Sequence, residues 1–177
     1  MIKFGTGGWR AVIGDDFTKA NIQLLAKALC RKMKDENAAD KGIVIGYDRR
    51  FLAKEAMQWA GQVFAAEGVT AYLVNKSAPT PLVMFYVMKH EMPYGMMITA
   101  SHNPAIYNGI KVFTAGGRDA SAQQTDEIEE YIDGCKYQTF SDTKIIVNKE
   151  EIDELLRELR MKTPDEIKRY QKIISNK

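Results

Sequence analysis

The chain has 177 residues, of which 45% are hydrophobic and 27% charged, as in a packed globular domain and unlike a disordered, collagen-like or coiled-coil chain. Its formal net charge of +2 comes without a dense basic run, so charge does not indicate a nucleic-acid partner. The cysteines Cys30 and Cys135 lack zinc-finger spacing, and no apolar run is long enough to span a membrane. We therefore expect a cytoplasmic protein with neither nucleic-acid nor membrane partners.

The first half of the chain predicts two helices and two strands in alternation. Apolar residues recur at helical spacing over residues 18–34 and again over residues 52–67, where Gly68 ends the pattern. Short runs rich in β-branched residues at 43–47 and 69–74 predict buried strands. This alternation is typical of a layered α/β domain.

A third helix is predicted at Thr80-Pro81, where Thr80 can cap the helix and Pro81 suits its first position. Residues 82–90 are apolar nearly all round, so this helix should be buried on more than one side. Two further strands, 95–99 and 109–113, flank a single loop.

The last predicted elements complete the fold class. Ser121 and Gln124 form a capping box that opens a helix extending to about residue 133. Together the segments predict a three-layer α/β/α sandwich with a mixed sheet of about four main strands. Residues 149–177 are about half charged, with sparse apolar anchors. We therefore expect a domain over residues 1–148 and a charged helical appendage over residues 149–177.

Two segments of this predicted domain carry candidate chemistry. The glycines of Gly5–Arg10 allow a backbone to approach an anion closely, and Arg10 offers a bidentate donor; the alternative is a flexible terminal turn. Ser101 and His102 lie on the loop between two strands, where a serine hydroxyl is a candidate nucleophile or phosphate carrier. The alternative for Ser101 is a hydrogen bond to its own loop backbone.

Cationic residues elsewhere in the chain could belong to the same site. Lys111 lies on a predicted strand, either as a solvated edge residue or with its ammonium directed at the Ser101 loop. Asp48 and Arg50 follow another strand and could form a surface ion pair or place a cation at the same site. The carboxyl ends of parallel strands are where α/β sheets bind ligands.

Taken together, these segments resemble the first domain of the α-D-phosphohexomutases, the family that includes phosphoglucomutase and phosphomannomutase. The resemblance covers about residues 2 to 160 in order, and its most specific part is the Thr-Ala-Ser-His-Asn-Pro hexapeptide. The matching segments are residues 5–10, 46–50, 78–81, 95–104 and 108–111.

The resemblance implies an enzyme of four domains that interconverts hexose 1-phosphate and hexose 6-phosphate through a phosphoserine and a sugar bisphosphate. It implies that Ser101 carries the phosphoryl group. The catalytic set implied around it is His102, Arg10 and Lys111. The residues implied to support the substrate or the loop are Thr6, Asp48, Arg50 and Asn103.

The resemblance also implies a Mg²⁺ cofactor, held by the phosphate on Ser101 and by an Asp-Gly-Asp-x-Asp loop, and a sugar bisphosphate activator. No such loop occurs in the sequence. We therefore expect a first domain that is inactive alone, with a hexose phosphate substrate and the enzyme's remaining domains as partners. Two alternatives stay open: a noncatalytic phosphate-binding or interaction module, and domain I of a phosphoglucosamine mutase or phosphopentomutase.

Overall fold

The computed structural model describes residues 2–5 and 8–135 and is built on one mixed sheet. The seven strands are β1 (Phe4–Gly5), β2 (Gly8–Val12), β3 (Ile43–Tyr47), β4 (Ala71–Leu73), β5 (Tyr94–Ile98), β6 (Tyr107–Thr114) and β7 (Arg118–Asp119). Six of them follow the order β1-β2-β6-β5-β3-β4, and β7 pairs with β6. Strand β3 is parallel to β4 and β5, whereas β6 is antiparallel to β5 and β2.

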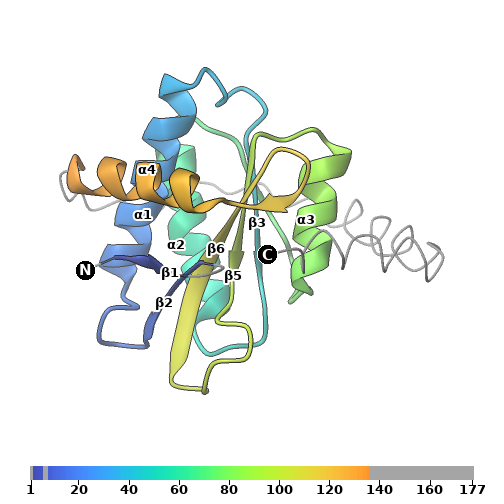
Figure 1. Ribbon diagram of the computed structural model, residues 1–177. Helices are drawn as coiled ribbons and strands as arrows, with labels where there is room; N and C mark the ends of the chain where they lie inside the picture. Colours follow the sequence, from blue (N-terminus) through green and yellow to red (C-terminus); the bar gives the residue numbers. More distant parts are fainter. Residues whose placement is uncertain (1, 6–7, 136–177) are drawn as a thin grey trace, which may run out of the picture.

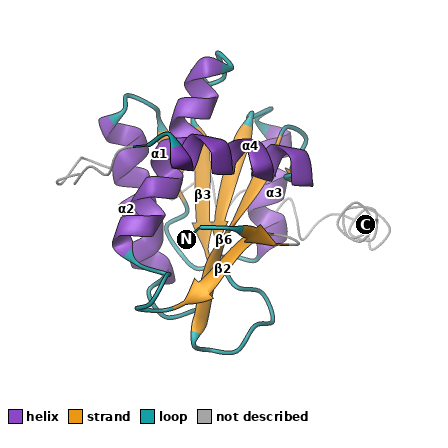
Figure 2. Cartoon of the chain, turned by 60° about the vertical axis from the view of Figure 1, so that its left-hand side comes forward, coloured by secondary structure: helices purple, strands orange, loops and turns teal. Residues whose placement is uncertain are grey.

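Helices cover both faces of this sheet, as Figures 1 and 2 show. On one face lie α1 (Lys19–Asp35), α2 (Ala53–Ala66) and α4 (Ala122–Asp133), and on the other lies α3 (Thr80–Lys89). The predicted three-layer α/β/α fold is therefore confirmed. The four predicted strands are β3, β4, β5 and β6, to which the structure adds β1, β2 and β7.

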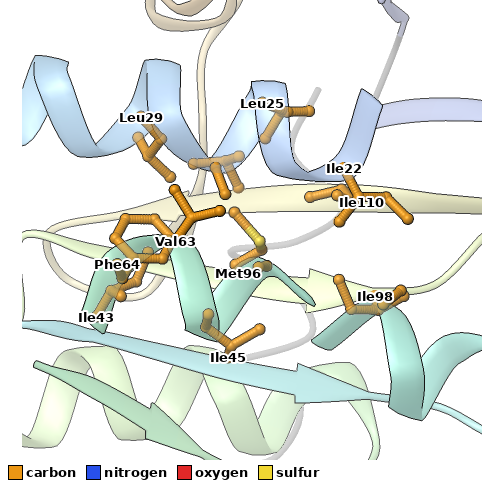
Figure 3. Packing of buried hydrophobic residues seen from close by; sticks show 14 of the residues in the cluster. Ile22, Leu25, Leu29, Ile43, Ile45, Val63, Phe64, Met96, Ile98 and Ile110 are labelled. Atoms are coloured by element: carbon orange, nitrogen blue, oxygen red, sulfur yellow. The ribbon is translucent and has the colours of Figure 1, made fainter. Parts of the chain in front are cut away.

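The alternation of side chains along the strands creates two separate cores. In β5, for example, Met96 and Ile98 face α1 and α2, whereas Met97 between them faces α3. Figure 3 shows the larger core, where residues of α1 and α2 pack against the central strands. Those labelled there are Ile22, Leu25, Leu29, Ile43, Ile45, Val63, Phe64, Met96, Ile98 and Ile110.

On the opposite face, α3 approaches the sheet closely because two strand residues lack side chains. A Cβ atom added at Gly46 would lie 2.4 Å from Cγ2 of Val83, and one added at Gly95 would lie 2.4 Å from Cγ2 of Val87. The helix is buried from Leu82 to Val87, as its apolar composition predicts.

The predicted helix boundaries hold to within a few residues, with one error in capping. The Ser121–Gln124 capping box is present with both of its hydrogen bonds. Thr80, however, does not cap α3, because it is the first residue of the helix itself. Pro79 occupies the capping position in an extended conformation and has no side-chain oxygen to accept a bond from the helix.

The segment around Arg10, residues 8–12, is a strand, so the alternative of a flexible terminal turn does not hold for these residues. Trp9 and Ala11 are buried in the larger core, and β2 pairs with β6 along its length. Among the described residues, no helix combines the length and apolarity needed to cross a membrane. The predicted boundary at residue 148 and the appendage over 149–177 lie outside the described residues.

Candidate functional site

Ser101 lies on an exposed loop where β5 ends, at the carboxyl edge of the parallel strands. Its backbone has a φ of +54°, in the left-handed region that few residues other than glycine adopt. The hydroxyl of Thr99 accepts a hydrogen bond of 2.9 Å from the Ser101 amide. Strained conformations of this kind cluster at functional sites, where the surrounding structure holds them in place.

The guanidinium of Arg50 supplies that restraint from the loop between β3 and α2. Its two terminal nitrogens donate hydrogen bonds to four backbone carbonyls of residues 101–107, in the loop that carries Ser101 and at the start of β6. The acceptors are the carbonyl oxygens of Ser101 (2.9 Å), Asn103 (2.5 Å), Pro104 (3.0 Å) and Tyr107 (2.8 Å). Asp48 in turn accepts a 2.9 Å bond from the Arg50 amide, and its other carboxylate oxygen lies 3.8 Å from Nε of Arg50. Asp48 and Arg50 therefore hold the loop together.

A buried amide that was not among the predicted site residues joins this arrangement to the sheet. Asn108, at 0% exposure, donates a 2.9 Å hydrogen bond to the carbonyl of Phe51 and accepts one of 2.8 Å from the Gly109 amide. It thus ties the segment after Arg50 to β6. An asparagine inside a strand-forming sequence, directly before Gly109, was the available signal, because asparagine is unfavourable in strands.

Arg10, on strand β2, contacts Ser101 although the two residues are far apart in the sequence. It is paired with Gly109 in the β2–β6 register and faces away from the core that holds Trp9. Its guanidinium donates a long hydrogen bond of 3.5 Å to the Ser101 hydroxyl and one of 3.5 Å to the carbonyl of Gly8. A charged donor therefore stands next to the hydroxyl, although the two residues are 91 positions apart.

Lys111 lies on the same face of the sheet as Arg10 but has a different partner. Its ammonium forms a 2.9 Å ion pair with Asp119 rather than contacting the Ser101 loop, and the two side chains are only 12% and 16% exposed. The interpretation as a solvated edge residue is wrong, since β6 lies between β2 and β5. Asp119 is a second residue that the sequence analysis missed.

The remaining predicted residues have less defined environments. His102 is exposed beside Ser101. Asn103 is half-buried, and its backbone amide donates a 3.0 Å hydrogen bond to the Ala100 carbonyl. Thr6 lies outside the described residues. The structure thus groups Arg10, Asp48, Arg50 and Asn103 around Ser101.

The residues that the structure describes do not fit a complete Mg²⁺ site. Within residues 2–5 and 8–135, no three His, Cys, Asp or Glu side chains are grouped so that they could hold a metal ion. Mg²⁺ requires near-octahedral oxygen coordination, of which a phosphate on Ser101 would provide only a part.

The comparisons with known proteins agree with this geometry. The family model described as phosphoglucomutase/phosphomannomutase, alpha/beta/alpha domain I, matches residues 1–139. A phosphoglucomutase of Staphylococcus saprophyticus is 34% identical over 139 residues, which are 77% of this chain and 25% of that protein. A Schizosaccharomyces pombe protein described as a phosphoribomutase is 39% identical over 123 residues, 66% of this chain and 21% of its own length.

Among solved structures, a Thermus thermophilus protein described as a phosphomannomutase superposes with a TM-score of 0.77 at 31% identity. The match covers 84% of this chain and 33% of that one. The chain spans about a quarter of the length of the curated relatives given above. Because the family model covers well over half of the residues, the chain belongs to the phosphoglucomutase/phosphomannomutase family and carries its α/β/α domain I.

Proposed function

We propose that this chain is the phosphoserine-bearing domain of an enzyme that interconverts hexose 1-phosphate and hexose 6-phosphate through a sugar bisphosphate. The observation that carries the proposal is the position of the Ser101 hydroxyl, 3.5 Å from the Arg10 guanidinium on a loop that Arg50 holds by four carbonyls. A fixed hydroxyl beside a cation is what phosphoryl transfer requires, because catalysis there depends on positioning and charge stabilisation.

The step assigned to Ser101 is a reversible phosphoryl transfer. Its Oγ forms a bond to the phosphorus of a sugar bisphosphate while the bond from that phosphorus to the sugar oxygen breaks. The serine proton ends on the released sugar hydroxyl, so the charges balance. In the reverse direction a sugar hydroxyl attacks the phosphoserine and returns the proton to Ser101.

Each neighbouring residue has a role that its geometry supports. Arg10 stabilises the negative charge that spreads over the phosphoryl oxygens in the transition state. Lys111 adds a second cation on the same face, and His102 lies beside Ser101 at the solvent boundary. Arg50, Asp48 and Asn103 position the loop. The Arg10 and Lys111 side chains are assigned to electrostatic stabilisation, since a cation is a poor proton acceptor in water.

Mg²⁺, a sugar bisphosphate activator and the further domains of the same enzyme complete the proposal. The described residues hold no cluster of metal ligands, so this domain would offer the ion little more than the phosphate on Ser101. The hexose phosphate would be bound in part by domains beyond this one, because the chain covers 25% of a related phosphoglucomutase.

The proposal is tested by incubating the purified chain with glucose 1,6-bisphosphate and Mg²⁺ and measuring its intact mass. We expect the mass of one added phosphoryl group, located on Ser101 by peptide sequencing. Ser101→Ala should abolish the addition, and Ser77→Ala, on another loop, should leave it unchanged. Addition that persists in Ser101→Ala, or no addition to the wild-type chain when the rest of a related enzyme is supplied, would refute the assignment.

A pentose phosphate is the second candidate substrate. It is favoured by the Schizosaccharomyces pombe relative described as a phosphoribomutase, which is 39% identical over 123 residues. Ribose 1,5-bisphosphate in the same mass assay distinguishes the two. Faster phosphorylation of Ser101 by the pentose donor than by the hexose donor would favour this candidate.

A further inference from the structure

The Lys111–Asp119 ion pair lies on the same face of β6 as Arg10. Arg10 is paired with Gly109, and Lys111 follows two residues later on the same face, opposite Gly8 on β2. Gly109 has no side chain to separate the two cations. Two neighbouring cations repel each other unless an anion compensates for one of them, and Asp119 does so for Lys111 at 2.9 Å.

The stem of Lys111 is fixed by a glycine on the neighbouring strand. Gly8 has a φ of +130°, and a Cβ atom there would lie 2.6 Å from the Ile110 carbonyl oxygen and 3.2 Å from Cγ of Lys111. Only glycine therefore fits opposite this lysine. The aliphatic part of Lys111 is consequently held against the backbone of β2, and its freedom lies mainly at the ammonium end.

Asp119 is also anchored on a rigid element. It pairs with Phe113 in the β6–β7 register, and the next amide, of Ala120, donates a 2.9 Å hydrogen bond to the Val112 carbonyl. The turn before it contains Gly117, where a Cβ atom would lie 2.1 Å from the carbonyl oxygen of Met84 on α3. The carboxylate therefore stands on a short strand, and the turn before that strand packs closely against α3.

We propose that Asp119 is a positioning residue for Lys111: it holds the ammonium on the face of the sheet that carries Arg10 and determines how far that charge turns toward a phosphoryl group on Ser101. The inference rests on the proposed function, because it gives Lys111 a phosphoryl group to meet. Without a phosphoryl group, Lys111 stays on Asp119, as in the structure. With one, the ammonium is shared between two anions, and Asp119 limits its movement.

The test follows the Lys111 ammonium by NMR in the full chain, with lysines labelled at Cε and Nζ and the signal assigned by Lys111→Arg. Asp119→Asn should raise the exchange of the ammonium protons with water by about tenfold, as expected for the loss of an ion pair between two little-exposed side chains. Asp119→Glu should retain most of the protection, and Asp40→Asn, at an exposed aspartate, should have no effect.

The positioning role is read out by installing phosphoserine at position 101 during synthesis. We expect the Lys111 signal to shift on phosphorylation in the wild-type chain and to shift further in Asp119→Asn. If the Lys111 signal of the wild-type chain does not shift when Ser101 is phosphorylated, the inference is overturned. This measurement needs no variant of Asp119. Equal shifts in both proteins would also overturn it.

The two proposals can fail separately. Because the phosphoserine is installed during synthesis, the NMR result does not depend on transfer from a sugar bisphosphate. Failure of Ser101 to accept a phosphoryl group in the mass assay would refute the proposed function and leave the Lys111–Asp119 result to stand. A phosphorylated Ser101 with an unresponsive Lys111 would refute only the positioning role.

Discussion

Arg50 acts on the loop backbone, with all four of its carbonyl acceptors between Ser101 and Tyr107. A guanidinium has five donors in a fixed plane, so it can satisfy several carbonyls at once, whereas a lysine ammonium cannot reproduce that geometry. The strained backbone at Ser101 is thereby compensated by bonds that do not use its side chain. Its hydroxyl stays available to Arg10 and to solvent.

Replacement of Arg50 should therefore loosen the loop more than the fold. We expect Arg50→Lys to speed hydrogen exchange at the amides of residues 101–107 by about tenfold or more, since hydrogen bonds from a charged donor are each worth about 1.5–3 kcal/mol. The exchange of β3 amides should be unchanged. Arg49→Lys is the matched control, because the neighbouring arginine is exposed. Equal exchange in the two variants would contradict the role assigned to Arg50.

Among single residues, the sequence allowed prediction of those site residues that stand in a short recognisable motif. Ser101, Arg10 and Arg50 each stand in such a motif, and the structure brings them together. Asp119 was missed for a different reason. Its importance comes from Lys111 on another strand, and a partner across a sheet leaves no local pattern. Asn108 stands in a motif, but its contact with the Phe51 carbonyl could not be read from that motif.

The packing of α3 on the sheet depends on strand positions that are glycine. Gly95 receives Val87 of the helix in the space that a Cβ atom would occupy. Gly95→Ala should destabilise the protein by about 1–3 kcal/mol, as is usual for an overpacked core. The measurement is the midpoint of chemical denaturation.

The same contact offers a compensating change. Adding Val87→Ala to Gly95→Ala removes the methyl groups that clash, so the double variant should be more stable than the two separate losses predict. Gly134→Ala is the control, because a Cβ atom there has no neighbour closer than 3.7 Å and the residue has a φ of −80°. Strictly additive losses would show that α3 shifts away instead of packing on Gly95.

Helix α4 is attached to α1 through an ionic cluster around the buried Lys32. Its ammonium donates to Glu127 at 2.5 Å and to Glu36 at 2.7 Å. Burial lowers the pKa of Lys32, but its hydrogen bonds to Glu127 and Glu36 outweigh that effect, so the net direction is upward. The bond from Lys32 lowers the pKa of the Glu127 carboxyl below its ordinary 4.5.

The lowered pKa of Glu127 determines the direction in which the stability of the folded state changes with pH. A carboxyl whose pKa is lowered on folding stabilises the folded state above its ordinary value, and that contribution is lost as the pH falls through the lowered one. We expect the melting temperature to fall as the pH is lowered below 4.5, and to fall less steeply in Glu127→Gln. Glu130→Gln, on the exposed side of α4, should follow the wild type. A Glu127→Gln profile as steep as the wild type would contradict this link.

Strand β2 shows why one element escaped prediction. Trp9 and Ala11 alternate with Arg10 as in any half-buried strand, but the glycines before them favour a loop. The strand is stabilised by β6, about a hundred residues later in the chain, which no local window includes. Helices α1, α2 and α4 were predictable because their apolar stripes and end signals lie within each segment.

For the whole molecule, we expect that the chain by itself does not interconvert hexose 1- and 6-phosphates. The described residues supply the proposed phosphoryl carrier and its neighbouring cations but no cluster for a metal ion. A coupled assay with glucose 1,6-bisphosphate and Mg²⁺ measures this directly. Supplying the remaining domains of a related enzyme in trans should restore weak activity that Ser101→Ala abolishes. Robust turnover by the chain alone would contradict the prediction.

The antiparallel pairing of β2 with β6 has a consequence for the order of events during synthesis. Residues 8–12 are made long before their partner, residues 107–114, which is made last among the strands that surround Ser101. Strand β2 must wait for its β6 partner while β3, β4 and β5 are made, and contacts of such long sequence separation form slowly. Arg10 can meet the Ser101 hydroxyl only after that wait. The contact between Arg10 and Ser101 therefore forms in the same step that completes the sheet.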